Sequence, residues 1–117
     1  MKTLLNVGCG WSNISQLKGF NNDNWKEIRF DIDKNVNPDI EGTLTDMSLV
    51  ETGSVDALYS THNIEHIYPH EVRIALKEFY RVINEDGFAY FNSSISFIEN
   101  IKMLKYNCYL LFLFFNF

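Results

Sequence analysis

The sequence predicts an α/β fold with a parallel sheet, and three observations support this prediction. Short apolar segments that suit buried strands alternate along the chain with segments of helical periodicity. The first apolar segment, residues 4–7, stops at Gly8 and Gly10, which let the chain turn sharply. The 117 residues form at most one domain, and an apolar content of 46% is ample for its core.

The first half of the chain predicts two strands joined by a short helix. After the glycines, an apolar stripe formed by Ile14, Leu17 and Phe20 favours a short helix that opens at Ser12. Residues 26–32 alternate between polar and apolar side chains, as a half-buried strand does. A strand, a glycine turn and a helix N-terminus in succession form a site for a nucleotide-like ligand.

The second half predicts three more strands and one long helix. Residues 39–44 favour a short strand, and residues 55–60 favour the central strand of this half. Apolar residues at helical spacing after Pro69 predict a helix of about four turns, with proline in its first turn. The turn-forming residues 84–87 end this helix, and residues 88–92 are the fifth expected strand.

Charge and cysteine content narrow the class of protein. The formal net charge is -5 and no cluster of Lys and Arg is present, which disfavours binding to a nucleic-acid backbone. The two cysteines, Cys9 and Cys108, lack metal-ligand spacing, and the start of the chain lacks a signal peptide. We therefore expect a cytoplasmic protein with free thiols. The apolar run from Tyr109 is far shorter than the roughly 20 residues of a membrane helix, so no membrane span is expected.

Residues 93–117 differ in character from the rest of the chain. This segment has few charged residues, no glycine and no proline, and it ends in a run of aromatic and aliphatic side chains. We assign residues 1–92 to the folded core and interpret residues 93–117 as an atypical hydrophobic tail of a truncated or frame-shifted product. The alternative is a real helix and strand that finish the core. A sheet that stays open after its fifth strand exposes a pairing edge, so self-association through this edge or the tail is expected.

Five motifs occur in order along residues 3–92. They are LLNVGCGWS at residues 4–12, FDID at 30–33, LTDMS at 44–48, GSVDALYSTHNIEH at 53–66 and EFYRVINEDGFAYF at 78–91. Together they resemble the motifs of class I S-adenosylmethionine-dependent methyltransferases, in particular the branch called methyltransferase type 11. The resemblance implies a Rossmann-like three-layer sandwich with a mostly parallel sheet of seven strands, about five of which are found here. It also implies S-adenosylmethionine as cofactor and methyl transfer to an unidentified acceptor.

The resemblance implies cofactor-binding roles for residues of these motifs. Gly8 and Gly10 would lie against the methionine part of the cofactor, with the polar Asn6 beside them. Asp31, about 20 residues after the glycines, would accept hydrogen bonds from both ribose hydroxyls, with Asp33 as the alternative. The predicted cofactor-binding set is Asn6, Gly8, Cys9, Gly10, Asp31, Ile32, Asp46, Met47 and Thr61.

Parts of this set have other interpretations. Asp46 would accept from the exocyclic amine of adenine and Met47 would pack on the ring, but a helix cap beside a core methionine is the alternative. The glycines alone are compatible with a plain tight turn. An NAD-type dinucleotide module is less favoured, because its fingerprint requires glycine where this chain has Asn13.

The segment STHNIEH, residues 60–66, follows the fourth expected strand, at the edge where open α/β sheets place their chemistry. His62, Glu65 and His66 would face the transferring methyl group, with His66 as general base for an acceptor hydroxyl or amine. Alternatively, Glu65 and His66 bond to the backbone and steady the loop. Residues 62–66 also fit the HxxEH pattern of zinc hydrolases, in which both histidines lie on one face of a helix. Pro69 indicates that the long helix begins only after His66, so no metal is predicted. A non-enzymatic, cofactor-binding remnant of a methyltransferase is the remaining alternative.

Overall fold

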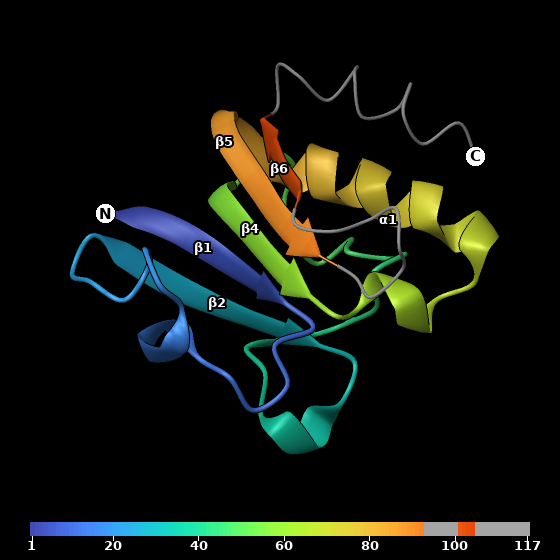
Figure 1. Cartoon of the computed structure of the whole chain (residues 1–117), viewed down its shortest axis with the longest axis horizontal. Helices are drawn as coiled ribbons and strands as arrows, with labels where there is room; N and C mark the ends of the chain where they lie inside the picture. Colours follow the sequence, from blue (N-terminus) through green and yellow to red (C-terminus); the bar gives the residue numbers. More distant parts are fainter. Residues whose placement is uncertain (93–100, 105–117) are drawn as a thin grey trace.

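A computed structural model describes residues 1–92 and 101–104, in which six strands form one sheet beside a single α-helix (Figure 1). The strands are β1 (Lys2–Val7), β2 (Trp25–Asp31), β3 (Ile40–Glu41), β4 (Val55–Thr61), β5 (Ile83–Asn92) and β6 (Ile101–Leu104). Their order across the sheet is β3-β2-β1-β4-β5-β6, and all neighbours are parallel except β5 and β6. The predicted α/β fold with a mostly parallel sheet is therefore confirmed.

The helix α1 (Pro69–Val82) covers one face of the sheet (Figure 1). It begins at Pro69, as predicted, because the first turn of a helix needs no N–H from proline. Glu71 in the first turn and Arg81 in the last turn match the helix dipole. Its buried side chains pack in the main core with residues of β1, β4 and β5. The side chains of α1 in this core are Val72, Leu76, Phe79 and Val82, and Ala75 is also buried.

The segment that was expected to form a turn, residues 84–87, is a bulge inside β5. The Asn84 side-chain amide donates to the Asp56 carboxylate (2.7 Å), and the Asp86 N–H donates back to the Asn84 side-chain oxygen (3.1 Å). A Cβ on Gly87 would lie 2.8 Å from the Asp56 carbonyl oxygen. The turn-forming residues thus allow the strand to bulge and do not separate it from α1.

The helix predicted from Ser12 is not formed. This stretch contains only a short 3-10 helix, η1 (Ile14–Gln16), which is closed by a capping box at Asn13. The backbone is already extended at Leu17 (φ -101°, ψ 104°), and Gly19 is left-handed (φ 93°). Local turn preferences therefore override the apolar stripe, and the glycine turn has no helix N-terminus beside it.

The apolar residues of this stretch still cover the second face of the sheet. Leu17 and Phe20 pack against Leu4 and Ala57 in a second, smaller core. Within the described residues, this face carries an irregular loop with η1, whereas the opposite face carries α1. The two outer layers of the sandwich are thus unequal.

The strand β6 lies inside the segment interpreted as an atypical tail. It pairs antiparallel with β5, with Ile101 opposite Phe91 and Leu104 opposite Phe88. This pairing covers the edge of β5 that was expected to be open. Residues 93–100 and 105–117, including Cys108, lie outside the described residues. No helix in the described part of the chain has the length and apolar character needed to cross a membrane.

Candidate functional site

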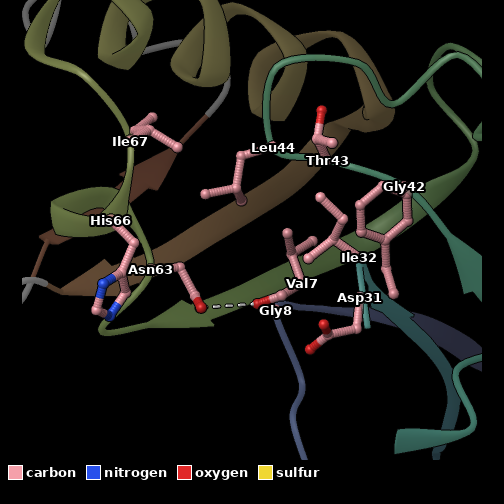
Figure 2. Close-up of a pocket in the computed structure, with 11 residues that line it drawn as sticks. Val7, Gly8, Asp31, Ile32, Gly42, Thr43, Leu44, Asn63, His66 and Ile67 are labelled. Carbon is pink, nitrogen blue, oxygen red and sulfur yellow. Dashed lines mark hydrogen bonds between the residues drawn. The ribbon is translucent and has the colours of Figure 1, made fainter. Parts of the chain in front are cut away.

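A cavity of about 290 Å³ opens at the carboxyl ends of β1, β2 and β4 (Figure 2). Four of its lining residues have polar side chains, namely Asp31, Thr43, Asn63 and His66, and the others are apolar or glycine. No Lys or Arg is among the lining residues. Ligands of open α/β sheets bind at this edge, and the polar groups here favour a ligand that donates hydrogen bonds or carries positive charge.

The turn after β1 forms one wall of the cavity and depends on glycine at two positions. Gly8 and Gly10 have left-handed backbones, with φ of 65° and 54°. The Gly8 N–H donates to the Phe30 carbonyl (2.7 Å). A Cβ on Gly8 would overlap the side-chain amide of Asn63, whereas a Cβ on Gly10 would meet open space. Gly8 is therefore required by its backbone and its surroundings, and Gly10 by its backbone alone.

Arg29 connects this turn to the loop after β2. Its guanidinium donates to four backbone carbonyls, those of Gly10 (2.6 Å), Ser12 (3.1 Å), Val36 (3.0 Å) and Asn37 (2.8 Å). Charge-assisted hydrogen bonds of this kind are stronger than neutral ones. The glycine turn is thus held in shape by a side chain of β2.

Asp31 lines the cavity at the end of β2, as predicted for the ribose-binding acid. Its Oδ2 accepts from the Gly10 N–H (2.8 Å) and its Oδ1 from the Asp33 N–H (2.8 Å). A carboxylate has about four acceptor positions, so both oxygens retain capacity for a ligand. Asp33 caps the short helix η2 (Lys34–Val36) through the Asn35 N–H and is not among the lining residues.

Besides Asp46 and Met47, four residues of the predicted cofactor set do not line the cavity, namely Asn6, Cys9, Gly10 and Thr61. Asn6 is buried in β1 and its amide donates to Glu27 (3.0 Å). Cys9 is 5% exposed, and burial raises the pKa of its thiol. Thr61, at the end of β4, contributes its backbone carbonyl to a hydrogen bond with Asn63.

The structure does not bring Asp46 and Met47 to the cavity. The Met47 side chain is fully buried in the main core, and its N–H donates to Glu78 (2.8 Å). Asp46 is exposed, and hydrogen bonds from Ser48 lower the pKa of its carboxyl. Met47 is thus a core methionine, as in the alternative interpretation, but Asp46 lies in a turn and caps no helix. Residues 42–44, a few positions earlier, form this wall of the cavity.

His62, Glu65 and His66 lie together after β4, around the short helix η3 (Ile64–His66). One oxygen of Glu65, Oε1, is 3.6 Å from His62 Nδ1 and 4.0 Å from His66 Nε2. The two histidine side chains are 68% and 76% exposed, whereas that of Glu65 is 16% exposed. Of the three, His66 lines the cavity. The described residues contain no group of three or more His, Cys, Asp or Glu that could hold a metal ion.

Asn63, in the same loop, was not among the predicted residues. Its Nδ2 donates to the Val7 carbonyl (3.1 Å), the Ser60 hydroxyl (2.9 Å) and the Thr61 carbonyl (2.9 Å). Figure 2 shows its side chain directed at Val7 and Gly8. Asn63 therefore joins the end of β1 to the end of β4. Its place in a loop after a parallel strand was the only signal in the sequence.

A second cavity, of about 380 Å³, lies on the face of the sheet opposite α1. It is lined by Lys18, Phe20, Tyr59, Phe88 and Tyr90. None of the predicted site residues is among them. The volume is larger than that of the first cavity, but the convergence of strand ends and polar groups favours the first as the functional site.

Comparisons with known proteins agree with this fold. Residues 5–91 match the methyltransferase domain family. Among solved structures, the chain is similar to a protein of Pyrococcus horikoshii (20% identity, TM-score 0.64), covering 79% of this chain and 46% of that one. It is also similar to a SAM-dependent methyltransferase of Methanosarcina mazei (18% identity, TM-score 0.62), covering 77% of this chain and 51% of that one. A SAM-dependent methyltransferase of Archaeoglobus fulgidus is similar as well (16% identity, TM-score 0.63), covering 79% of this chain and 44% of that one. The chain thus spans about half the length of these structures. No curated protein matches it.

Proposed function

The chain belongs to the methyltransferase domain family, whose implied cofactor is S-adenosylmethionine, and we propose that it binds this cofactor in the 290 Å³ cavity and transfers the methyl group to an unidentified acceptor. One observation carries the proposal. The glycine turn, the carboxylate of Asp31 and the loop that holds Asn63 and His66 meet at a single cavity. These groups come from three strand ends that are far apart in the sequence.

The lining groups fit the chemistry of this cofactor. Asp31 keeps acceptor positions for the ribose hydroxyls, and the absence of Lys and Arg from the lining suits a molecule with a sulfonium and an ammonium group. Ile32, which is 65% exposed, and Leu44 offer apolar surface to a purine ring. The methionine part then lies along the turn at Gly8 and Gly10, where missing Cβ atoms permit close approach.

When bound, S-adenosylmethionine supplies a methyl group that its sulfonium has already activated. The task of the protein is then to align donor and acceptor and to keep water away. His66 at the cavity wall is the residue of this chain suited to remove a proton from an acceptor hydroxyl or amine. Glu65, which is less exposed than His62 and His66, has its Oε1 within 4.0 Å of a ring nitrogen of each histidine, so its negative charge stabilises the imidazolium that forms when either ring takes up a proton.

Calorimetric titration of S-adenosylhomocysteine, the cofactor product, tests the proposal. We expect the wild-type chain to bind it and Asp31→Ala to bind it about 10- to 100-fold more weakly, since a hydrogen-bonded charged acceptor is lost. Asp33→Ala is the matched control, because it removes a carboxylate two residues away that does not line the cavity. Absence of heat at millimolar ligand with folded wild-type protein refutes the proposal.

A further inference from the structure

The neighbours of Asn63 fix the orientation of its side-chain amide. Nδ2 lies 3.1 Å from the Val7 carbonyl oxygen and 2.9 Å from the Thr61 carbonyl oxygen. Both oxygens can only accept hydrogen bonds, so the reversed amide would set oxygen against oxygen. Ser60, the third partner of Nδ2, is 1% exposed, so water does not compete for these bonds. The nitrogen must therefore face the ends of β1 and β4.

The amide oxygen of Asn63 consequently lies on the cavity side. In the described part of the chain, no group donates a hydrogen bond to Oδ1, and no buried side-chain oxygen there lacks a partner. Oδ1 is thus accessible from the cavity that Asn63 lines. It lies directly beside the turn, because a Cβ on Gly8 would overlap it. An acceptor is therefore presented to a ligand at the glycine turn.

We propose that Asn63 Oδ1 accepts a hydrogen bond from the protonated amino group of the methionine part of S-adenosylmethionine. This inference rests on the proposed function, which sets the methionine part against Gly8. The ammonium group is the strong donor at that end of the molecule, whereas the ribose hydroxyls are assigned to Asp31. A carbonyl-type acceptor next to bare backbone, in a cavity without Lys or Arg, suits a cationic donor.

Two ligands and two variants test this contact in the full chain. S-adenosylhomocysteine carries the amino group, and 5′-methylthioadenosine has the same adenosine and thioether but lacks the amino-acid end, with both its amino group and its carboxylate. Asn63→Leu removes the amide at similar volume. We expect it to weaken S-adenosylhomocysteine about 10- to 100-fold and 5′-methylthioadenosine less than about 3-fold, measured as Kd by calorimetry. Ser60→Ala, the control, removes one partner of Nδ2 but leaves Oδ1, and we expect both Kd values to change less than about 3-fold.

The ratio of the two Kd values separates a direct contact from a structural role. Equal weakening of both ligands by Asn63→Leu, or no weakening of S-adenosylhomocysteine, overturns the inference while the proposed function stands. Failure of the wild-type chain to bind either ligand refutes the proposed function itself. If Asn63→Leu does not fold, Asn63→Ser gives the same ratio, because it keeps a hydroxyl donor near the strand ends and withdraws the amide oxygen from the cavity.

Discussion

The turn after β1 and the loop after β4 both line the cavity, and they are held in different ways. The turn is fixed by hydrogen bonds to its backbone. The Gly8 N–H donates to Phe30, the Gly10 N–H donates to Asp31, and the Gly10 carbonyl accepts from Arg29. These groups all come from β2, so pairing of β1 with β2 also shapes the turn.

The loop after β4 is held mainly by one side chain, Asn63, and it presents two exposed histidines, His62 and His66. The two segments therefore have different roles in the proposed function: the turn and Asn63 bind the cofactor, whereas the two histidines of the loop face the acceptor. Substitutions in the turn should therefore reduce stability and cofactor affinity together, whereas substitutions of the histidines should leave both almost unchanged.

The largest effect is expected for Gly8→Ala. The new Cβ overlaps the Asn63 amide, and the left-handed backbone adds strain of about 1–2 kcal/mol. We expect affinity for S-adenosylhomocysteine to fall by at least about 100-fold and the Tm to drop by several degrees. Gly10→Ala is the control, because it has the same backbone strain and open space around the Cβ. Equal losses in the two variants contradict the role given to Asn63 as neighbour of the turn.

A smaller loss of cofactor affinity is expected for Arg29→Met, which removes the donors to four backbone carbonyls. We expect the free energy of unfolding to fall by about 2–4 kcal/mol in urea, with cofactor affinity reduced as the turn loosens. Lys26→Met, at an exposed position of the same strand, should change it by no more than about 0.5 kcal/mol. If the two variants are equally stable, Arg29 does not hold the turn.

A pH-dependent effect on stability is expected at Glu78 in α1. A hydrogen bond from Arg81 lowers the pKa of Glu78 below its ordinary value of 4.5, and the pair binds the backbone of Met47. A lowered pKa gives stability that is present above pH 4.5 and is lost as the pH falls through the folded-state pKa. Glu78→Gln should therefore be less stable than the wild-type chain at pH 7. In urea unfolding this difference should shrink below pH 4.5; a constant difference contradicts the assignment.

The smallest effects are expected for His62→Ala and His66→Ala. Both side chains are more than two-thirds exposed. Unfolding free energy should change by about 0.5 kcal/mol or less, and affinity for S-adenosylhomocysteine by less than about 3-fold. If either variant loses as much cofactor affinity as Arg29→Met, the assignment of the two histidines to the acceptor is wrong.

Much of the fold follows from the local spacing of apolar residues, because each strand and helix must bury one side in the core. The helix from Pro69 and the five parallel strands follow from apolar spacing, and β3 is shorter than expected at two residues. The prediction fails where distant residues decide. Met47 is drawn into the core beneath α1, so residues 42–44 take its place at the cavity.

The role of Asn63 could not be read from the sequence for the same reason. Its amide acquires partners because β1 and β4, about fifty residues apart in the chain, pair in parallel and end at the same edge. Asp31, by contrast, was predicted to lie at the end of the second strand, and the structure places it there, where it lines the cavity. Spacing along the chain therefore locates single strand ends, while contacts between strand ends require the fold.

The central claim, that the cavity at the strand ends is the cofactor site, is tested most directly by amide chemical shifts of the ¹⁵N-labelled chain titrated with S-adenosylhomocysteine. The account predicts the largest shifts for residues of the glycine turn and the cavity walls, namely Gly8, Gly10, Ile32, Thr43 and Asn63. It predicts little change at Met47 in the core and at Lys18, Tyr59 and Tyr90 on the opposite face. Shifts confined to that opposite face contradict the account.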